Sequence, residues 1–411
     1  MPGEPAAVED APPTDSPGVV LRDGVGDEPR GGPGDEPPDA LWDALPDESR
    51  DEPPDALPDA LPDESRDEPP DALLQGPGGP GVAVPGMLAD TGLTPRPPRG
   101  VFELEGRAAP GLYLAGCGLV VAGLGSIFIA LAAGGGSGAT VAFVVGLAAA
   151  GLGLVAGAGS QALQRRADGA VYAGPSPVAV FVAAFLLTLV VGFALGALNV
   201  VPEGPISVLA SVLISAGVSL GVVALVVVGS GALSWREMGL RLPGPGEVSV
   251  LADLGLGVAL AVPALLGAAF LAGILIALLG VAPTAPLPPA EDPAGVVVNL
   301  LVAAVLAPFW EEVFFRGFVT TAWARTAGPR AAIVRGAIFF ALIHVITLVG
   351  SDFDTAIRTA LIAFAIRLPV GLVLGWVFLR RRTLVAPMAL HATYNAIPVL
   401  LLALGAGATP S

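Results

Sequence analysis

Long apolar stretches fill residues 101–411 and constrain the fold more than any other feature of the chain. The hydrocarbon core of a bilayer is about 30 Å thick, and a helix needs about 20 residues to cross it. Inside lipid a spanning helix satisfies its own backbone hydrogen bonds. The sequence therefore predicts an all-α, polytopic transmembrane helix bundle with about nine spans: 111–132, 138–160, 177–199, 205–229, 250–281, 294–326, 331–350, 355–379 and 384–406.

Charge is divided unevenly between the two parts of the chain. Residues 1–100 hold 23 acidic residues and six arginines, whereas residues 101–411 hold 13 acidic residues and 14 arginines. The mean hydropathy of the whole chain is +0.75, and a soluble domain of this size needs many more surface charges. This pattern excludes a soluble enzyme and a nucleic-acid-binding protein with a basic face. A single cysteine, Cys117, excludes an internal disulfide scaffold.

The acidic N-terminal part contains a 16-residue repeat. DEPPDALWDALPDESR at 35–50 is followed by DEPPDALPDALPDESR at 51–66 and by DEPPDAL at 67–73. Proline removes backbone donors and like charges repel each other, so a segment of this composition cannot bury a core. We therefore expect residues 1–100 to form a disordered, solvated tail, with a docking or tethering role as the alternative.

The arginines predict the orientation of the bundle. Loops that carry arginine alternate with loops that lack it, which agrees with nine spans. Because positively charged loops stay on the cytoplasmic side, we expect a multi-pass protein of the plasma membrane with a cytoplasmic N-terminal tail. The arginines that flank the predicted spans are Arg96, Arg99, Arg107, Arg165, Arg166, Arg236, Arg241, Arg325, Arg330, Arg380, Arg381 and Arg382.

Two adjacent carboxylates interrupt the sixth predicted span. A charged side chain at the centre of a helix in lipid costs about 2.5–3.5 kcal/mol on insertion scales, so Glu311 and Glu312 require a partner or a function. Glu312 and Arg316 are four residues apart and can pair on one helix face, which leaves Glu311 free to point into a cavity. Pro308 either kinks this helix or begins its second half, where the helix dipole favours anions.

The only two histidines of the chain, His344 and His391, also lie inside predicted spans. Glu311 and His344 are each 14 residues from the arginines that flank the turn between their helices, about 21 Å along the helix axis. Counted from Arg382, Asn395 lies about 20 Å and His391 about 14 Å along the last span. Three spans thus bring polar groups to a similar depth, with His391 and Asn395 on one face.

These side chains suit the hydrolysis of an amide by water. A carboxylate and an imidazole can hold one water molecule and remove its proton, and an amide and a second imidazole can stabilise the oxyanion that forms. Neither Cys117 nor a serine accompanies the cluster in the sequence, which disfavours a covalent nucleophile. Zinc remains an alternative because two His and two Glu are acceptable ligands, although the chain has no H-E-x-x-H motif.

Three motifs occur in a recognisable order: EEVFFR at 311–316, FALIH at 340–344 and HATYN at 391–395. Together they resemble the E-E-x-x-x-R, F-x-x-x-H and H-x-x-x-N motifs of the CPBP family of intramembrane glutamic endopeptidases, which includes the type II CAAX prenyl proteases and Abi proteins. SWREMGL at 234–240 is similar to a stretch often found upstream in that family. The resemblance implies no metal and a set of six catalytic residues: Glu311 and His344 activate water, Glu312 and Arg316 shape the site, and His391 and Asn395 stabilise the oxyanion.

The resemblance also divides the chain into three parts. We expect a tail at 1–100, N-terminal transmembrane helices at 101–230 and the CPBP-type protease core at 231–411. The implied activity is endopeptidase cleavage of a membrane-associated protein or peptide within the lipid bilayer, without a cofactor or nucleic acid. A non-proteolytic immunity or scaffold factor and a proton-coupled transporter are the alternatives.

One further charged residue lies inside a predicted span. Arg367 stands two residues before Pro369, well within the stretch 355–379. We expect it either to pair with a carboxylate of the bundle or to extend its side chain towards the membrane surface.

Overall fold

The computed structural model describes residue 100 and residues 103–200, 204–243, 248–282, 287, 290, 292–346 and 352–406. Contacts divide the chain into Met1–Leu93 and Thr94–Ser411, and the first unit lies outside the described residues. The predicted disordered tail therefore also lies outside them, apart from Gly100. The boundary at 230/231 between the two predicted membrane parts stays a prediction.

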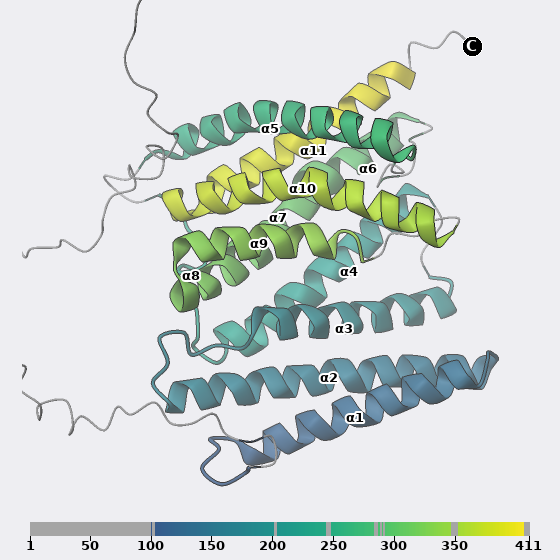
Figure 1. Cartoon of the computed structure of the whole chain (residues 1–411), viewed down its shortest axis with the longest axis vertical. Helices are drawn as coiled ribbons and strands as arrows, with labels where there is room; N and C mark the ends of the chain where they lie inside the picture. Colours follow the sequence, from purple (N-terminus) through teal and green to yellow (C-terminus); the bar gives the residue numbers. More distant parts are fainter. Residues whose placement is uncertain are drawn as a thin grey trace, which may run out of the picture. The chain divides into compact units, whose positions relative to one another are not determined.

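Helices make up the second unit, and no strand occurs in the ranges given above (Figure 1). They are α1 (Pro110–Ala132), α2 (Ser137–Ala167), α3 (Pro177–Ala197), α4 (Pro205–Val223), α5 (Val250–Leu279), α6 (Pro293–Leu301), α7 (Ala307–Glu311), α8 (Thr321–Ala327), α9 (Pro329–Ile343), α10 (Phe353–Arg381) and α11 (Val385–Ala406). Three π-helical segments continue or join them: η2 (Ala224–Val228), η3 (Val302–Leu306) and η4 (Glu312–Thr320).

Eight helices in the described part of the chain are long and apolar enough to cross a membrane. They match eight of the predicted spans, and the helical run from α6 to α8 forms one of them. The ninth predicted span, 331–350, corresponds to α9, which ends at Ile343 after 15 residues and is shorter than the membrane is thick. The prediction of a polytopic all-α membrane protein is confirmed, with α9 as a shorter helix inside it.

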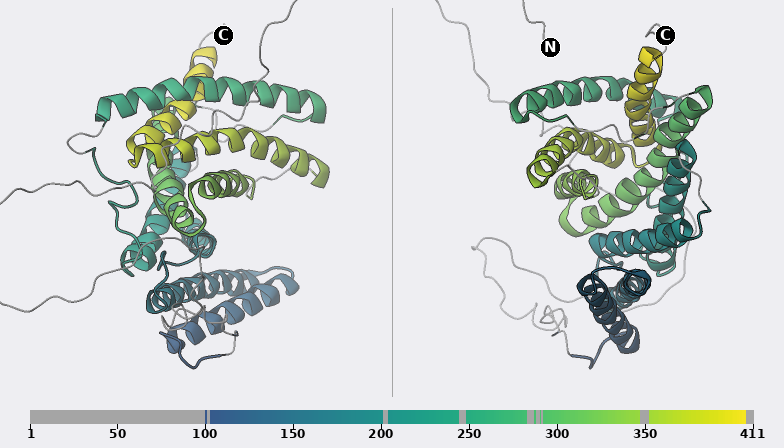
Figure 2. Two further views of the ribbon diagram at one scale, coloured as in Figure 1. Left: turned by 60° about the vertical axis from the view of Figure 1, so that its left-hand side comes forward. Right: turned by 90° about the vertical axis from the view of Figure 1, so that its right-hand side faces the viewer.

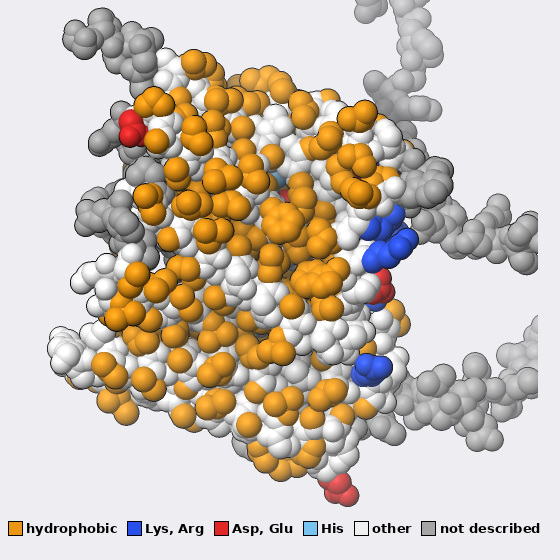
Figure 3. All heavy atoms as spheres, turned by 180° about the vertical axis from the view of Figure 1, so that it is seen from behind, with side chains coloured by type: hydrophobic (Ala, Val, Ile, Leu, Met, Phe, Trp, Pro, Cys, Tyr) orange, Lys and Arg blue, Asp and Glu red, His pale blue; other side chains and the backbone are white. Residues whose placement is uncertain are grey.

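Most helices of the bundle lie alongside one another. Helices α1, α2 and α3 are consecutive neighbours, and α10 packs against α5, α9 and α11. Helix α4 and the run from α6 to α8 cross them obliquely (Figures 1 and 2). Hydrophobic side chains cover the face shown in Figure 3, while arginines gather at one edge of it. An apolar surface bounded by charge at its edge is the surface that a lipid bilayer requires.

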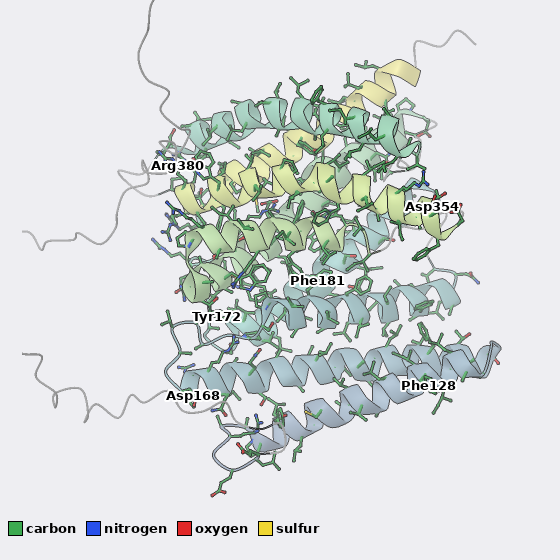
Figure 4. The ribbon with its side chains drawn as sticks, viewed as in Figure 1. Phe128, Asp168, Tyr172, Phe181, Asp354 and Arg380 are labelled. Carbon is green, nitrogen blue, oxygen red and sulfur yellow. The ribbon has the colours of Figure 1, made fainter. Side chains whose placement is uncertain are left out.

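The two ends of the bundle differ in charge. Asp168 and Arg380 lie at one end, and Phe128 and Asp354 lie at the opposite end (Figure 4). The last turns of α2 and α10 supply arginines to the first end: Arg165, Arg166, Arg380 and Arg381. This segregation agrees with the alternation of arginine-bearing loops along the sequence.

Helices α1 and α2 approach closely at glycines. A Cβ atom on Gly123 would lie 2.5 Å from Ala150 N and 2.6 Å from Gly146 O, whereas a Cβ atom on Gly125 would meet nothing within 4 Å. Small residues allow helices to pack tightly in lipid, where no hydrophobic force drives them together.

We expect Gly123→Ala to destabilise the bundle by about 1–3 kcal/mol, because the added methyl group overpacks this contact. Gly125→Ala is the matched control, since both changes raise helix propensity equally. Unfolding of the purified protein in mixed micelles measures the difference. Equal stability of the two variants would contradict the close packing of α1 on α2.

The connection after η2 closes the arginine-bearing end of the bundle. Glu237 Oε2 accepts hydrogen bonds of 2.7 Å from both Ser234 N and Ser234 Oγ, and Glu237 Oε1 accepts one of 2.7 Å from Arg325 Nη2. Further along, Leu384 N donates to Gly239 O at 3.0 Å. The connection thus links α8 to the residue that precedes α11.

The bond from Arg325 and those from Ser234 lower the pKa of Glu237 from 4.5 to about 2. A depressed carboxyl pKa adds stability above pH 4.5 that disappears as the pH falls towards 2. The pair is largely exposed, so we expect Glu237→Gln to cost only about 0.2–1 kcal/mol at pH 7. In unfolding measurements from pH 7 to pH 2.5, the difference between wild type and variant should shrink. A difference that grows in acid would contradict the pair's contribution.

Candidate active site

A π-helical segment carries the second carboxylate and the arginine of the E-E-x-x-x-R motif. All nine residues of η4 are buried, and its three phenylalanines, Phe314, Phe315 and Phe318, belong to the main hydrophobic cluster. Thr320 Oγ1 donates to Phe315 O, five residues earlier, at 2.9 Å. Such widened turns are rare, and they occur frequently at functional sites. Here the segment holds two charged side chains in an otherwise apolar core.

Pro308 continues the helix rather than interrupting it. It follows η3, in which backbone N–H groups reach carbonyls five residues back. In that pattern the N–H of residue 308 would donate to Ala303 O, but proline has no N–H. Asn395 Nδ2 from α11 donates to this carbonyl at 3.0 Å. One amide hydrogen of Asn395 is therefore used to hold α11 against the π-helical segment.

Glu312 is the centre of a buried ionic network. Its Oε1 accepts a hydrogen bond of 2.8 Å from Arg316 Nη1 and one of 2.7 Å from His391 Nδ1. Glu312, Arg316 and His391 are 0 %, 2 % and 5 % exposed. The predicted pairing of Glu312 with Arg316 is present, and the same carboxylate also orients the imidazole from the last helix.

Glu311 faces both imidazole rings. Its Oε2 lies 3.7 Å from His344 Nε2 and 3.9 Å from His391 Nε2. This oxygen is buried, and no described residue gives it a hydrogen bond. The histidines reach it from different helices, His344 from the end of α9 and His391 from α11.

The protons on His344 follow from its partners. His344 Nδ1 donates to Phe340 O at 2.6 Å, because a carbonyl oxygen can only accept. In the neutral ring Nε2 is then the acceptor, and it is the nitrogen that faces Glu311. At these separations one water molecule can contact the carboxylate and both Nε2 atoms at ordinary hydrogen-bond distances. The arrangement can hold a nucleophilic water and remove its proton.

Phe340 is a site residue that reasoning from the sequence did not select. Its ring centroid lies 4.4 Å from that of His344 and 5.8 Å from that of His391, and the guanidinium of Arg316 stacks over it at 4.3 Å. The ring thus packs against the buried cation and against both imidazoles. The signal was present in the sequence, because Phe340 is the first residue of the F-x-x-x-H motif.

The structure brings five of the six predicted site residues together: Glu311, Glu312, Arg316, His344 and His391. Asn395 lies one turn after His391, and its amide contacts Ala303. In the residues that the structure describes, no group of three or more His, Cys, Asp or Glu side chains forms a candidate metal site.

Comparison with protein families gives a match to part of the chain. The sequence profile described as Type II CAAX prenyl endopeptidase Rce1-like matches residues 293–397, about a quarter of the chain. No curated protein and no solved structure matches. The matched segment starts at α6 and ends within α11, so it contains the whole polar cluster. Residues 293–397 of this multi-pass membrane protein are therefore similar to the Rce1-like family, which agrees with the CAAX-type intramembrane proteases that the three motifs indicate.

Proposed function

We propose that the protein is an intramembrane endopeptidase that hydrolyses peptide bonds of membrane-associated proteins or peptides with an activated water molecule. The observation that carries this proposal is the approach of two imidazole Nε2 atoms, at 3.7 and 3.9 Å, to a buried Glu311 oxygen that no described residue hydrogen-bonds. The Rce1-like match supports the same class of reaction.

In the proposed reaction the water oxygen attacks the carbonyl carbon of the peptide bond while Glu311 takes one of the water protons. His344 Nε2 accepts a hydrogen bond from the second water proton and so orients the nucleophile. The carbonyl oxygen becomes an oxyanion in a tetrahedral intermediate. When this intermediate collapses, the C–N bond breaks and Glu311 returns its proton to the leaving amine.

His391 is the donor that we propose for the oxyanion. The bond from its Nδ1 to Glu312 orients the ring, and in the doubly protonated ring the Nε2 hydrogen is offered to a developing negative charge. The second amide hydrogen of Asn395 is the other proposed donor. Glu312 and Arg316 hold these groups in place and do not contact the reacting atoms.

The location of the site supports a substrate that is held in the membrane. We propose that the protein resides in the plasma membrane with its N-terminal tail on the cytoplasmic side, because arginines gather at one end of the bundle. The proposed substrate is a membrane-associated protein or peptide, and the proposed chemistry uses no cofactor and no nucleic acid.

Peptide release from host membranes tests the proposal. Purified protein in liposomes is incubated with the host membrane proteome, and released peptides are identified by mass spectrometry for wild type and Glu311→Gln. Peptides that appear only with wild type support the endopeptidase. Identical release by both proteins would contradict it and favour a scaffold or immunity factor, whereas proton-coupled uptake into the liposomes would favour a transporter. Loss of activity with a chelator and recovery with zinc would overturn the metal-free reaction.

A further inference from the structure

Arg367 is a cation inside the membrane-spanning part of the bundle, and its guanidinium makes one hydrogen bond to a described residue. It is the fifteenth of the 29 residues of α10, so it lies at the middle of that helix. Its Nη1 donates to Ala363 O, on the preceding turn of its own helix, at 3.0 Å. A guanidinium has five N–H donors, and the other four have no partner among the described residues. The sequence left open a carboxylate partner or a side chain that extends towards the membrane surface, and no carboxylate lies within 4 Å of Arg367 in the described part of the chain.

None of the other described charged groups at this depth forms an ion pair with the guanidinium of Arg367. Arg316 is paired with Glu312 through an ion pair of 2.8 Å. Arg367 interacts electrostatically with Glu311, His344 and Tyr394. Helix α10 also packs against α9 and α11, which carry the two catalytic imidazoles. Arg367 therefore lies at the middle of the helix that packs beside both imidazole-bearing helices.

The chemistry of the side chain indicates what binds there. Donors without partners are expensive in a low-dielectric surrounding. The planar fork of a guanidinium matches a carboxylate, to which it can donate two parallel hydrogen bonds. On a peptide this group comes from the C-terminus of the chain or from an aspartate or glutamate side chain. Both sources would place a negative charge beside the scissile bond.

We propose that Arg367 binds a carboxylate of the peptide substrate and selects peptides that carry this group close to the cleaved bond. The inference rests on the proposed endopeptidase function and names the substrate class of that site. Hydrogen bonds to a charged group contribute enough free energy to change affinity about ten- to a hundredfold. Peptides with such a carboxylate should therefore bind and react better than matched peptides without it.

Matched peptides test the proposal in two arms. The probes are fluorescein-labelled eight-residue peptide mixtures, made with a C-terminal free acid or a C-terminal amide, and amide mixtures with either aspartate or asparagine at one position. Binding is measured by fluorescence anisotropy on Glu311→Gln protein in lipid nanodiscs, which needs no turnover. Quenched versions of the same mixtures measure kcat/KM on the otherwise unchanged protein.

Arg367→Gln should abolish the preference for the carboxylate, and Arg367→Lys should keep part of it. Arg358→Gln is the matched control, because Arg358 lies on the same helix but pairs with Asp354 near the N-terminal end of α10. Preference for the free acid identifies the chain terminus as the source, and preference for aspartate identifies a side chain.

Three results would overturn the proposal: equal binding of all mixtures to the parent protein, a preference that survives Arg367→Gln, or an equal loss of activity towards every mixture. The last would show that Arg367 acts on Glu311 instead. Binding preference without any hydrolysis would contradict the endopeptidase but keep the carboxylate site, so the two failures are distinguishable.

Discussion

Glu312→Ala should destabilise the folded bundle by about 3–5 kcal/mol, because it leaves the charge of Arg316 buried without its partner. The carboxylate is fully buried and accepts two short hydrogen bonds through one oxygen, from Arg316 and from His391. Removing it also frees the imidazole that Glu312 orients. Unfolding in mixed micelles measures the stability. The loss of the hydrogen bonds to Glu312 should also appear as faster amide hydrogen exchange in residues 312–320.

The single variants Glu312→Leu and Arg316→Met and the double variant Glu312→Leu/Arg316→Met form a double-mutant cycle. Each single change leaves one buried charge uncompensated, whereas the double change removes both, so the double variant should recover most of the lost stability. Its catalytic activity should not recover, because His391 still lacks its acceptor. Additive losses in the cycle would contradict a direct interaction between the two charges.

The sequence predicted the helical spans and the convergence of three of them because both depend on local rules. Apolar length determines where a helix crosses lipid, and residue counts from the flanking arginines gave Glu311 and His344 equal depth. The close approach of Glu311 Oε2 to His344 Nε2 follows from this equal depth. The pairing of Glu312 with Arg316 needed only helical spacing.

Other features depend on tertiary contacts that helical periodicity does not contain. The π-helical segments shift the face on which side chains emerge, and nothing in the apolar pattern of 293–327 marks where they begin. Asn395 was predicted as a donor to an oxyanion, yet its amide also satisfies the carbonyl that Pro308 leaves without a donor. The early end of α9 places His344 at a helix terminus rather than within a span, which apolar length alone did not indicate.

Glu311→Gln should lower peptide hydrolysis by about a hundred- to ten-thousandfold while the protein stays folded. Glutamine keeps the shape of the side chain but cannot accept a proton from water. The replaced oxygen, Oε2, receives no hydrogen bond from the described residues, so its loss breaks no hydrogen bond with them. This variant should therefore lose activity but keep its stability, whereas Glu312→Ala should lose both.

His344→Ala provides the second half of this test. The ring contacts Phe340 through its Nδ1 bond and through a tilted ring–ring contact, so some stability is lost together with the acceptor for water. Combining it with Glu311→Gln should cost little additional activity, because both residues act on the same water. Glu237→Gln makes the same chemical change outside the membrane and should leave hydrolysis intact. If Glu311→Gln retained hydrolysis at the wild-type rate, this carboxylate could not be the base, whatever its distance from the two imidazoles.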